Sequence, residues 1–240
     1  MAGIKGVLFD KDGTLVDFHK TWRALADLMA LHAAEGDRAR ADMLLEAAGY
    51  DHEAGCFRAD SAFAAGTNAD IVAIWYRDAS DARRREMVLH FDEVTAAEGA
   101  RSSVPLPGCR EAIASLHDSG FRLGVATNDS TSGAEKTLLA LGIAQMFDAA
   151  YGYDAVANPK PAPDTIQAFG DLTGLKPAEI AMVGDNRHDL EMAKAGGAGL
   201  AVAVLSGTGT RESLSPLADV VLDSIVDLPE FLRERNRLLA

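Results

Sequence analysis

Three short apolar runs, each followed by polar residues, constrain the fold more than any other feature of the sequence. They cover residues 4–9, 121–126 and 180–183, and weaker runs lie at 149–152, 200–205 and 220–222. Continuous apolar runs of this length are typical of parallel strands that are covered on both faces of a sheet.

Helical patterns alternate with the later runs, at 109–117, 134–141, 165–173 and 190–195. Each ends at or near a glycine, which easily adopts the left-handed conformation found after a helix. The alternation predicts an α/β fold with a doubly wound parallel sheet.

The segment between the first strand and residue 100 has a different character. It is rich in Ala, Leu, Arg, Glu and Asp, and no strand pattern interrupts it; helices are expected at 20–34, 37–48, 68–78 and 81–98. Residues 102–108 contain two prolines and a glycine and predict a linker back to the sheet. We therefore expect an α/β core formed by residues 1–16 and 101–240, with an all-helical domain of residues 17–100 inserted after the first strand.

The charge and composition of the chain exclude several classes of partner. Its net charge of −13 argues against nucleic acid or an anionic membrane, because both need a basic surface. An anionic substrate would have to be held by local positive charge. No membrane span is expected, because no uncharged apolar stretch of about 18 residues is present. No signal peptide is expected either, because residues 1–9 lead straight into a predicted strand and lack an apolar core with a small-residue cleavage site. The two cysteines, Cys56 and Cys109, predict free thiols in a reducing cytoplasm.

Polar side chains follow the three strongest predicted strands at the points where they end. Asp10 follows the first strand, Thr127 the second, and Asp185 the third. In open parallel sheets, ligands bind beyond the carboxyl ends of the strands, so these side chains are expected at one edge. A single acidic residue after a strand is usually part of a turn or a helix cap. Three strand ends with complementary groups predict a functional site.

The first strand end carries the sequence Asp10-Lys11-Asp12-Gly13-Thr14. Two carboxylates that lie two residues apart, before a tight glycine turn, can converge on one hard cation such as Mg²⁺. An aspartate can attack phosphorus to form an aspartyl phosphate, and a second acid can protonate the leaving alkoxide and later deprotonate water. The alternative is an ordinary Asp-Gly turn.

Two further groups could complete a site for phosphoryl transfer. Asp185 and Asp189 lie where the third strand leads into a helix, and they could hold a divalent ion or cap the helix. Lys160 lies between Pro159 and Pro161, which restrict the backbone around it. Its ammonium group could offset the charge of a phosphoryl group, or it could be a solvated lysine in a turn.

Taken in order, these groups resemble the four motifs of the haloacid dehalogenase superfamily. Residues 10–14 resemble the first motif, Thr127 the second, Lys160 the third, and Asp185 with Asp189 the fourth. The resemblance implies a Mg²⁺-dependent enzyme in which Asp10 attacks phosphorus and also binds the metal. It implies that Asp12 is the general acid and base. Dehalogenases of this superfamily lack that second aspartate, so its presence favours phosphoryl transfer over cleavage of a carbon–halogen bond.

The resemblance also implies the remaining roles: phosphoryl binding by Thr127, Asn128 and Lys160; metal binding by Asp10, the backbone carbonyl of Asp12, and Asp185; and support by Gly13 and Asp189. Gly13 and Asn128 are expected to donate backbone amides. Lys11 stands where an apolar residue is more usual in the superfamily, and it is expected to point away along the strand end.

The inserted helical block resembles the cap of the phosphoglycolate phosphatase-like branch. A cap would cover the site, exclude water during transfer and select the substrate. The candidates for contact with the leaving group are His19, Lys20, Arg23, Arg58 and Arg77. For each of them the alternative is a charge on a solvated helix face.

These observations together predict a phosphatase that acts on a small phosphorylated metabolite, either phosphoglycolate-like or a sugar phosphate, as a monomer or homodimer. The nearest alternative is a phosphosugar mutase, which returns the phosphoryl group to a sugar. Alternatives of another class are a phospho-accepting signalling receiver and a non-catalytic binding module.

Overall fold

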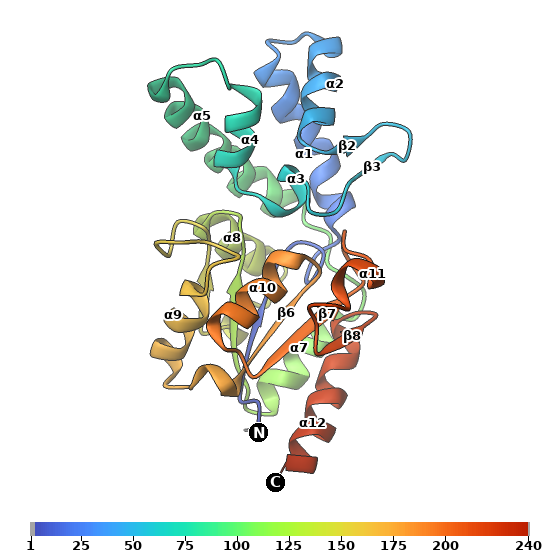
Figure 1. Ribbon diagram of the computed structural model, residues 1–240, viewed down its shortest axis with the longest axis vertical. Coiled ribbons are helices and arrows are strands. Elements are labelled where there is room, and N and C mark those ends of the chain that lie inside the picture. Colours follow the sequence, from blue (N-terminus) through green and yellow to red (C-terminus); the bar gives the residue numbers. More distant parts are fainter. Residues whose placement is uncertain (1–2, 240) are drawn as a thin grey trace.

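The computed structural model describes residues 3–239 and contains a six-stranded parallel sheet. A helical segment lies above this sheet (Figure 1). The strands follow the order β5(Ala149–Tyr151), β4(Arg122–Ala126), β1(Gly6–Phe9), β6(Ile180–Gly184), β7(Leu200–Val204) and β8(Val220–Leu222). The first strand lies at the centre, and Phe9 pairs in register with Val125 on one side and Val183 on the other. The ends of β1, β4 and β6 are therefore level, and the predicted doubly wound parallel sheet is confirmed.

Helices cover both faces of this sheet. They are α7(Cys109–Asp118), α8(Thr131–Ala140), α9(Asp164–Thr173), α10(Arg187–Gly196), α11(Arg211–Leu214) and α12(Leu228–Leu239), with short 3₁₀ turns at η2(Ala144–Met146), η3(Pro177–Glu179) and η4(Ile225–Asp227). Successive side chains of β1 point to opposite faces. Val7 and Phe9 pack in one apolar cluster with residues of α7, α8 and α12, whereas Leu8 packs with residues of α9, α10 and α11. Both faces are thus buried, as the continuous apolar runs predict.

The helical segment above the sheet begins directly after the first strand. It contains α1(Phe18–Ala33), α2(Arg38–Ala47), α3(Ala62–Ala65), α4(Asn68–Trp75) and α5(Asp81–Val94), and the last helix continues through η1(Thr95–Gly99) into α6(Ala100–Ser102). Polar side chains at Asp17, Asp37, Thr67 and Ser80 cap four of these helices. The segment has its own apolar cluster, from Phe18 to Phe91, separate from the two clusters of the sheet. We call it the cap; its boundaries at residues 17 and 100 stay a prediction.

One feature of the cap differs from the all-helical expectation. A short antiparallel hairpin, β2(Tyr50–Asp51) and β3(Cys56–Phe57), lies between α2 and α3. Its turn forms because the side chain of Asp51 accepts hydrogen bonds from the amides of Glu53 and Ala54, and Gly55 adopts a φ of 71°. Strands of two residues are too short to produce an alternating pattern, so the sequence does not reveal them.

The remaining expectations from composition concern cysteines and membranes. Cys56 and Cys109 are both free thiols, as predicted. Among residues 3–239, no helix combines the length and the apolar character needed to cross a bilayer.

Candidate active site

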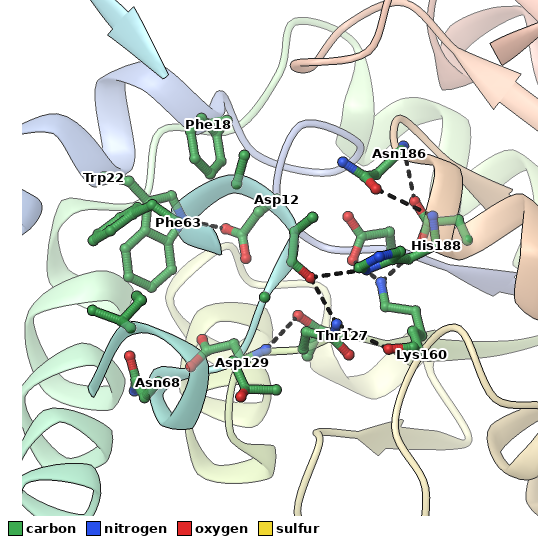
Figure 2. Close-up of a pocket in the computed structure, with 18 residues that line it drawn as sticks. Asp12, Phe18, Trp22, Phe63, Asn68, Thr127, Asp129, Lys160, Asn186 and His188 are labelled. Carbon is green, nitrogen blue, oxygen red and sulfur yellow. Dashed lines mark hydrogen bonds and ion pairs between the residues drawn. The ribbon is translucent and has the colours of Figure 1, made fainter. Parts of the chain in front are cut away.

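The carboxyl ends of β1, β4 and β6 meet beneath the cap, and they enclose a cavity of about 60 Å³. Asp10, Thr127 and Lys160 line it from the core, and the cap contributes aromatic side chains from the opposite side (Figure 2). Asp185 follows β6 and is buried. Its carboxylate lies within 4.8 Å of the carboxylate of Asp10, which lines the cavity. The sequence prediction that the three strand ends converge is therefore met in the structure.

Lys160 connects the end of β1 to the first turn of α10. Its Nζ donates hydrogen bonds of 2.7 Å to Asp10 Oδ1 and 2.7 Å to Asp189 Oδ1. Burial alone would lower the pKa of this ammonium group, but the two carboxylates outweigh that effect and raise the pKa above its usual value. Lys160 is therefore a buried, permanently charged residue, and the alternative of a solvated lysine is wrong.

Asp10 is the carboxylate to which this lysine points. Its backbone amide donates to the Val183 carbonyl, which fixes it to the neighbouring strand. Burial raises the pKa of Asp10 to about 7; Lys160 opposes this shift, and the negative charges of Asp189 and Asp12 add to it. A carboxyl group with such a pKa needs nearby positive charge to remain ionised at neutral pH.

Three buried carboxylates offer a site for a metal ion. One oxygen each from Asp10, Asp185 and Asp189 lies within 4.8 Å of the other two. The pKa of Asp185 is raised, first by burial and then by the charges of Asp10 and Asp189. Mg²⁺ prefers hard oxygen ligands, and a cation would offset the repulsion among these groups. The donor set therefore fits Mg²⁺.

Glycine at two positions allows the chain to approach Asp185 closely. Gly13 has a φ of 83°, and a Cβ atom built there would lie 2.6 Å from the Asp185 carboxylate. A Cβ atom at Gly207 would lie 2.0 Å from Asp185 Oδ2. The expectation that Gly13 donates a free amide is wrong, because its N–H donates to the Val16 carbonyl in the turn. Gly13 supports the site through its conformation and its small size.

Asp189 has two roles in the structure, and of these the helix cap was considered from the sequence. Its Oδ2 accepts a hydrogen bond from the Asn186 amide in a capping box at the start of α10, and its Oδ1 accepts from Lys160. The N-cap residue is Asn186, whose Oδ1 accepts from the His188 amide. Asn186 Nδ2 is buried without a partner among residues 3–239, and the residue lines the cavity. Sequence reasoning gave Asn186 no role.

Thr127 and Asn128 line the cavity at the end of β4. The Thr127 hydroxyl oxygen accepts a hydrogen bond from the Asp129 amide at 3.1 Å, so its proton can point toward a bound oxygen. The Asn128 side chain instead donates to two backbone carbonyls, those of Lys160 and of Ala65 in the cap. His188 Nδ1 lies 3.2 Å from the same Ala65 oxygen. These contacts hold the cap against the core.

Lys11 is the residue that departs most from the sequence prediction. It does not point away from the site: it is 1% exposed, and its Nζ lies 2.6 Å from Asp12 Oδ2 and 3.2 Å from Asp129 Oδ2. It also lies 5.1 Å from the centre of the Trp22 ring. The two carboxylates outweigh the effect of burial and raise the pKa of Lys11. Asp129, by contrast, has a raised pKa because of burial, which Lys11 partly offsets.

Asp12 is held from two directions. Lys11 binds one of its carboxylate oxygens, and Trp22 Nε1 donates to the other at 2.6 Å. Because Lys11 comes from the core and Trp22 from helix α1 of the cap, Asp12 lies at the boundary of the two parts (Figure 2).

The five charged cap residues that were expected to contact the leaving group do not line the cavity. Lys20 pairs with Asp17, Arg23 lies over the Tyr50 ring, Arg58 donates to the Glu46 carbonyl, Arg77 is near Asp78, and His19 is exposed beside Phe18. That prediction is wrong. Charged side chains tend to face water because their desolvation is costly. The cap instead lines the cavity with Phe18, Trp22, Phe63, Ala64, Ala65, Gly66, Thr67, Asn68 and Ile71.

Comparison with known proteins agrees with this geometry. Residues 4–197 match the family model described as haloacid dehalogenase-like hydrolase. The chain belongs to the haloacid dehalogenase-like hydrolases. The "Phosphoglycolate phosphatase" of Salmonella typhimurium is 31% identical over 251 aligned residues, which cover 95% of this chain and 92% of the relative. The Escherichia coli protein of the same name is 30% identical over 248 residues, which cover 94% of this chain and 91% of that one.

Solved structures show the same fold in other hydrolases of this kind. CbbY from Rhodobacter sphaeroides, crystallised with phosphate, superposes with a TM-score of 0.69 at 24% identity, over 94% of this chain and 96% of that one. A hydrolase from Pseudomonas syringae has a TM-score of 0.69 at 22% identity and covers 96% and 98%. As a haloacid dehalogenase-like hydrolase whose relatives are phosphatases, the chain is a phosphoric monoester hydrolase, and the signalling-receiver alternative is wrong.

Proposed function

We propose that this hydrolase is a Mg²⁺-dependent phosphatase that cleaves a small phosphate monoester through an aspartyl phosphate on Asp10. The observation that supports this most strongly is the position of Lys160. It binds Asp10 and Asp189 together, beside the third carboxylate of Asp185. An aspartate at the end of a central strand, hydrogen-bonded to a buried lysine and placed beside carboxylates that can hold a cation, is suited to nucleophilic attack.

In the first step, Asp10 attacks the phosphorus atom, and the bond between phosphorus and the ester oxygen breaks. Lys160 offsets the charge on the phosphoryl oxygens and holds Asp10 in line, and the Thr127 hydroxyl donates to one of those oxygens. Asp12, in its protonated form, gives its proton to the leaving alkoxide, so that a neutral alcohol departs.

In the second step, Asp12 is an ionised carboxylate and takes a proton from water. The resulting hydroxide attacks phosphorus, the acyl phosphate bond breaks, and inorganic phosphate and free Asp10 are released. Mg²⁺, held by Asp10, the Asp12 backbone carbonyl and Asp185, would supply further positive charge to the phosphoryl group. Asp189 holds Lys160 in place beside this site.

Hydrolysis of p-nitrophenyl phosphate by the purified protein tests this proposal. We expect Mg²⁺-dependent activity that a chelator abolishes, and a loss of about 10⁴-fold or more in Asp10→Asn. Asp78→Asn is the matched control, because the Asp78 side chain is 93% exposed and lies outside the cavity lining. If Asp10→Asn retained activity while the fold was intact, the assignment of the nucleophile would be wrong. If activity survived the chelator, the metal requirement would be wrong.

A further inference from the structure

The cavity has two chemically different ends. Lys160, Asn186 and His188 lie on one side of it, and Phe18, Trp22 and Phe63 gather on the other, beside Asp12 (Figure 2). If Asp12 protonates the leaving oxygen, the leaving group must lie next to Asp12, against the aromatic side chains of the cap. This placement of the leaving group rests on the proposed function.

The aromatic end of the cavity is closely packed. Trp22 meets Phe63 edge to face at 6.1 Å, and Phe63 stacks on Phe57 at 4.6 Å. Ile71 completes the apolar wall, and Asn68 adds a neutral polar group whose Nδ2 donates to Asp92. Aromatic faces of this kind suit the apolar face of a ring or a carbon chain with hydroxyl groups at its edge.

The charges at this end are negative, apart from one lysine. Asp12 and Asp129 both line the cavity, and Lys11 lies between them without lining it. Because Lys11 is 1% exposed and pairs with both carboxylates, its ammonium group is committed to them and is not available to a substrate.

The basic residues that line the cavity lie at its phosphoryl end. Among the cavity residues within the described chain, only Lys160 and His188 can carry positive charge. Lys160 is paired with Asp10 and Asp189, and His188 contacts the Ala65 carbonyl on the same side. A carboxylate or a second phosphate on the leaving group would be buried near Asp129, away from Lys160 and with no unpaired cation beside it among the described cavity residues, which is costly.

We infer that this enzyme selects phosphate monoesters whose leaving group carries no negative charge, such as the monophosphate of a neutral sugar, polyol or phenol. It discriminates against phosphoglycolate, although its relatives carry that name. The selectivity comes from the neutral aromatic wall of the cap, from Asp129, and from the lack of an unpaired cation among the described residues at the leaving-group end.

Two matched pairs of esters test the inference. In the first pair, 2-hydroxyethyl phosphate carries a neutral hydroxymethyl group where 2-phosphoglycolate carries a carboxylate. In the second pair, 4-carboxyphenyl phosphate carries a carboxylate that phenyl phosphate lacks. We expect kcat/KM to be about tenfold or more higher for the neutral member of each pair. Equal or better hydrolysis of the carboxylated members would overturn the inference while leaving the phosphatase activity intact. If no ester of the four, nor p-nitrophenyl phosphate, were hydrolysed, the proposed function itself would have failed.

Two variants test whether charge at the cap wall determines the selectivity. Ala64 lines the cavity and is only half-buried, so Ala64→Lys adds a cation to the cap wall; we expect it to raise the ratio of phosphoglycolate to hydroxyethyl phosphate hydrolysis about tenfold. Ala62→Lys, on the same short helix but outside the cavity lining, should leave the ratio unchanged.

If Ala64→Lys does not fold, Asp129→Asn gives the same test from the core. It removes one negative charge from the leaving-group end and should shift the ratio in the same direction, severalfold. A ratio that moved with neither variant would show that charge is not the basis of selection.

Discussion

The core and the cap build opposite walls of one cavity from opposite kinds of side chain. The core wall holds Asp10, Asp12 and Asp129 with two buried lysines behind or beside them, and the cap wall holds Phe18, Trp22 and Phe63. The core wall suits the transfer of a charged phosphoryl group, because its charges are fixed in place before the substrate arrives. The cap wall suits selection of the leaving group, because its described residues offer shape and apolar surface but no cation.

The two buried lysines of the core differ in what they can reach. Lys160 and Lys11 are each paired with two aspartates. Lys160 lines the cavity and can meet the phosphoryl group, whereas Lys11 does not line it and can act only on its two partners. Changes at Lys160 should therefore affect every substrate, and changes at Lys11 should act through Asp12 and through stability.

The largest effect is expected at Lys160. Lys160→Met removes the charge that faces the phosphoryl group, so kcat should fall about 10²–10³-fold for neutral and carboxylated esters alike. Steady-state kinetics on both pairs of esters measures this. Lys5→Met is the control, because it removes a surface ion pair with Glu179 and should leave kcat unchanged. A loss confined to one class of ester would contradict the division between core and cap.

The next effect is expected at Lys11. Lys11→Met leaves Asp12 and Asp129 without the buried cation that pairs with both, so the free energy of unfolding should fall by about 3–5 kcal/mol. Chemical denaturation measures it. The double variant Lys11→Met/Asp129→Asn should be more stable than the single variant, because one unpaired carboxylate is removed. Unchanged stability of Lys11→Met would show that the buried pairs contribute little.

Metal binding should depend on pH through the core carboxylates. Without metal, the pKa of Asp10 is raised to about 7, so a proton occupies it below neutral pH; burial and the charge of Asp10 raise the pKa of Asp185 as well. Mg²⁺ binds the ionised form and must displace that proton; its affinity should fall about tenfold per pH unit below pH 7. Isothermal titration calorimetry in two buffers of different ionisation enthalpy measures both the affinity and the protons released. An affinity that stayed constant on acidification would rule out these ligands.

The smallest effect is expected where the cap meets the core. The Tyr153 hydroxyl, after β5, donates to Asp92 Oδ2 on helix α5 of the cap. Tyr153→Phe removes this bond at a cost of about 1 kcal/mol, so KM should rise a few-fold with little change in kcat. The double variant Asp92→Asn/Tyr153→Phe should have nearly the same KM as Tyr153→Phe alone, because the bond between the two residues is already lost. Additive losses would mean that the two residues act separately.

The core could be predicted from the sequence better than the cap, and the reason is physical. Strands buried on both faces must be continuously apolar, so Asp10 and Asp185 could be placed at their ends without a structure. Helix starts were less accurate: α10 begins at Arg187, before the predicted residue 190, because its first turn is polar and is fixed by the Asn186 cap. Polar first turns carry no apolar periodicity.

The cap wall could not be predicted because its aromatic residues have the same helical spacing as core residues. Trp22 and Phe63 belong to the apolar cluster of the cap and also line the cavity. Charge favoured Arg23 and Arg77 instead, which lie outside the cavity lining. Lys11 was misjudged because Asp129, one of its two partners, is more than a hundred residues away in the sequence. Only the fold brings that second carboxylate close enough to keep the lysine buried.

Reductive trapping tests the role of Asp10 as the nucleophile most directly. The enzyme is mixed with p-nitrophenyl phosphate, quenched during turnover and treated with borohydride, which reduces an acyl phosphate to an alcohol. Peptide mass spectrometry should then find homoserine at position 10 and nowhere else, and substrate-free enzyme should show none. An unmodified Asp10 during demonstrated turnover, or homoserine in place of Asp12 or Asp185 instead, would contradict the proposed mechanism.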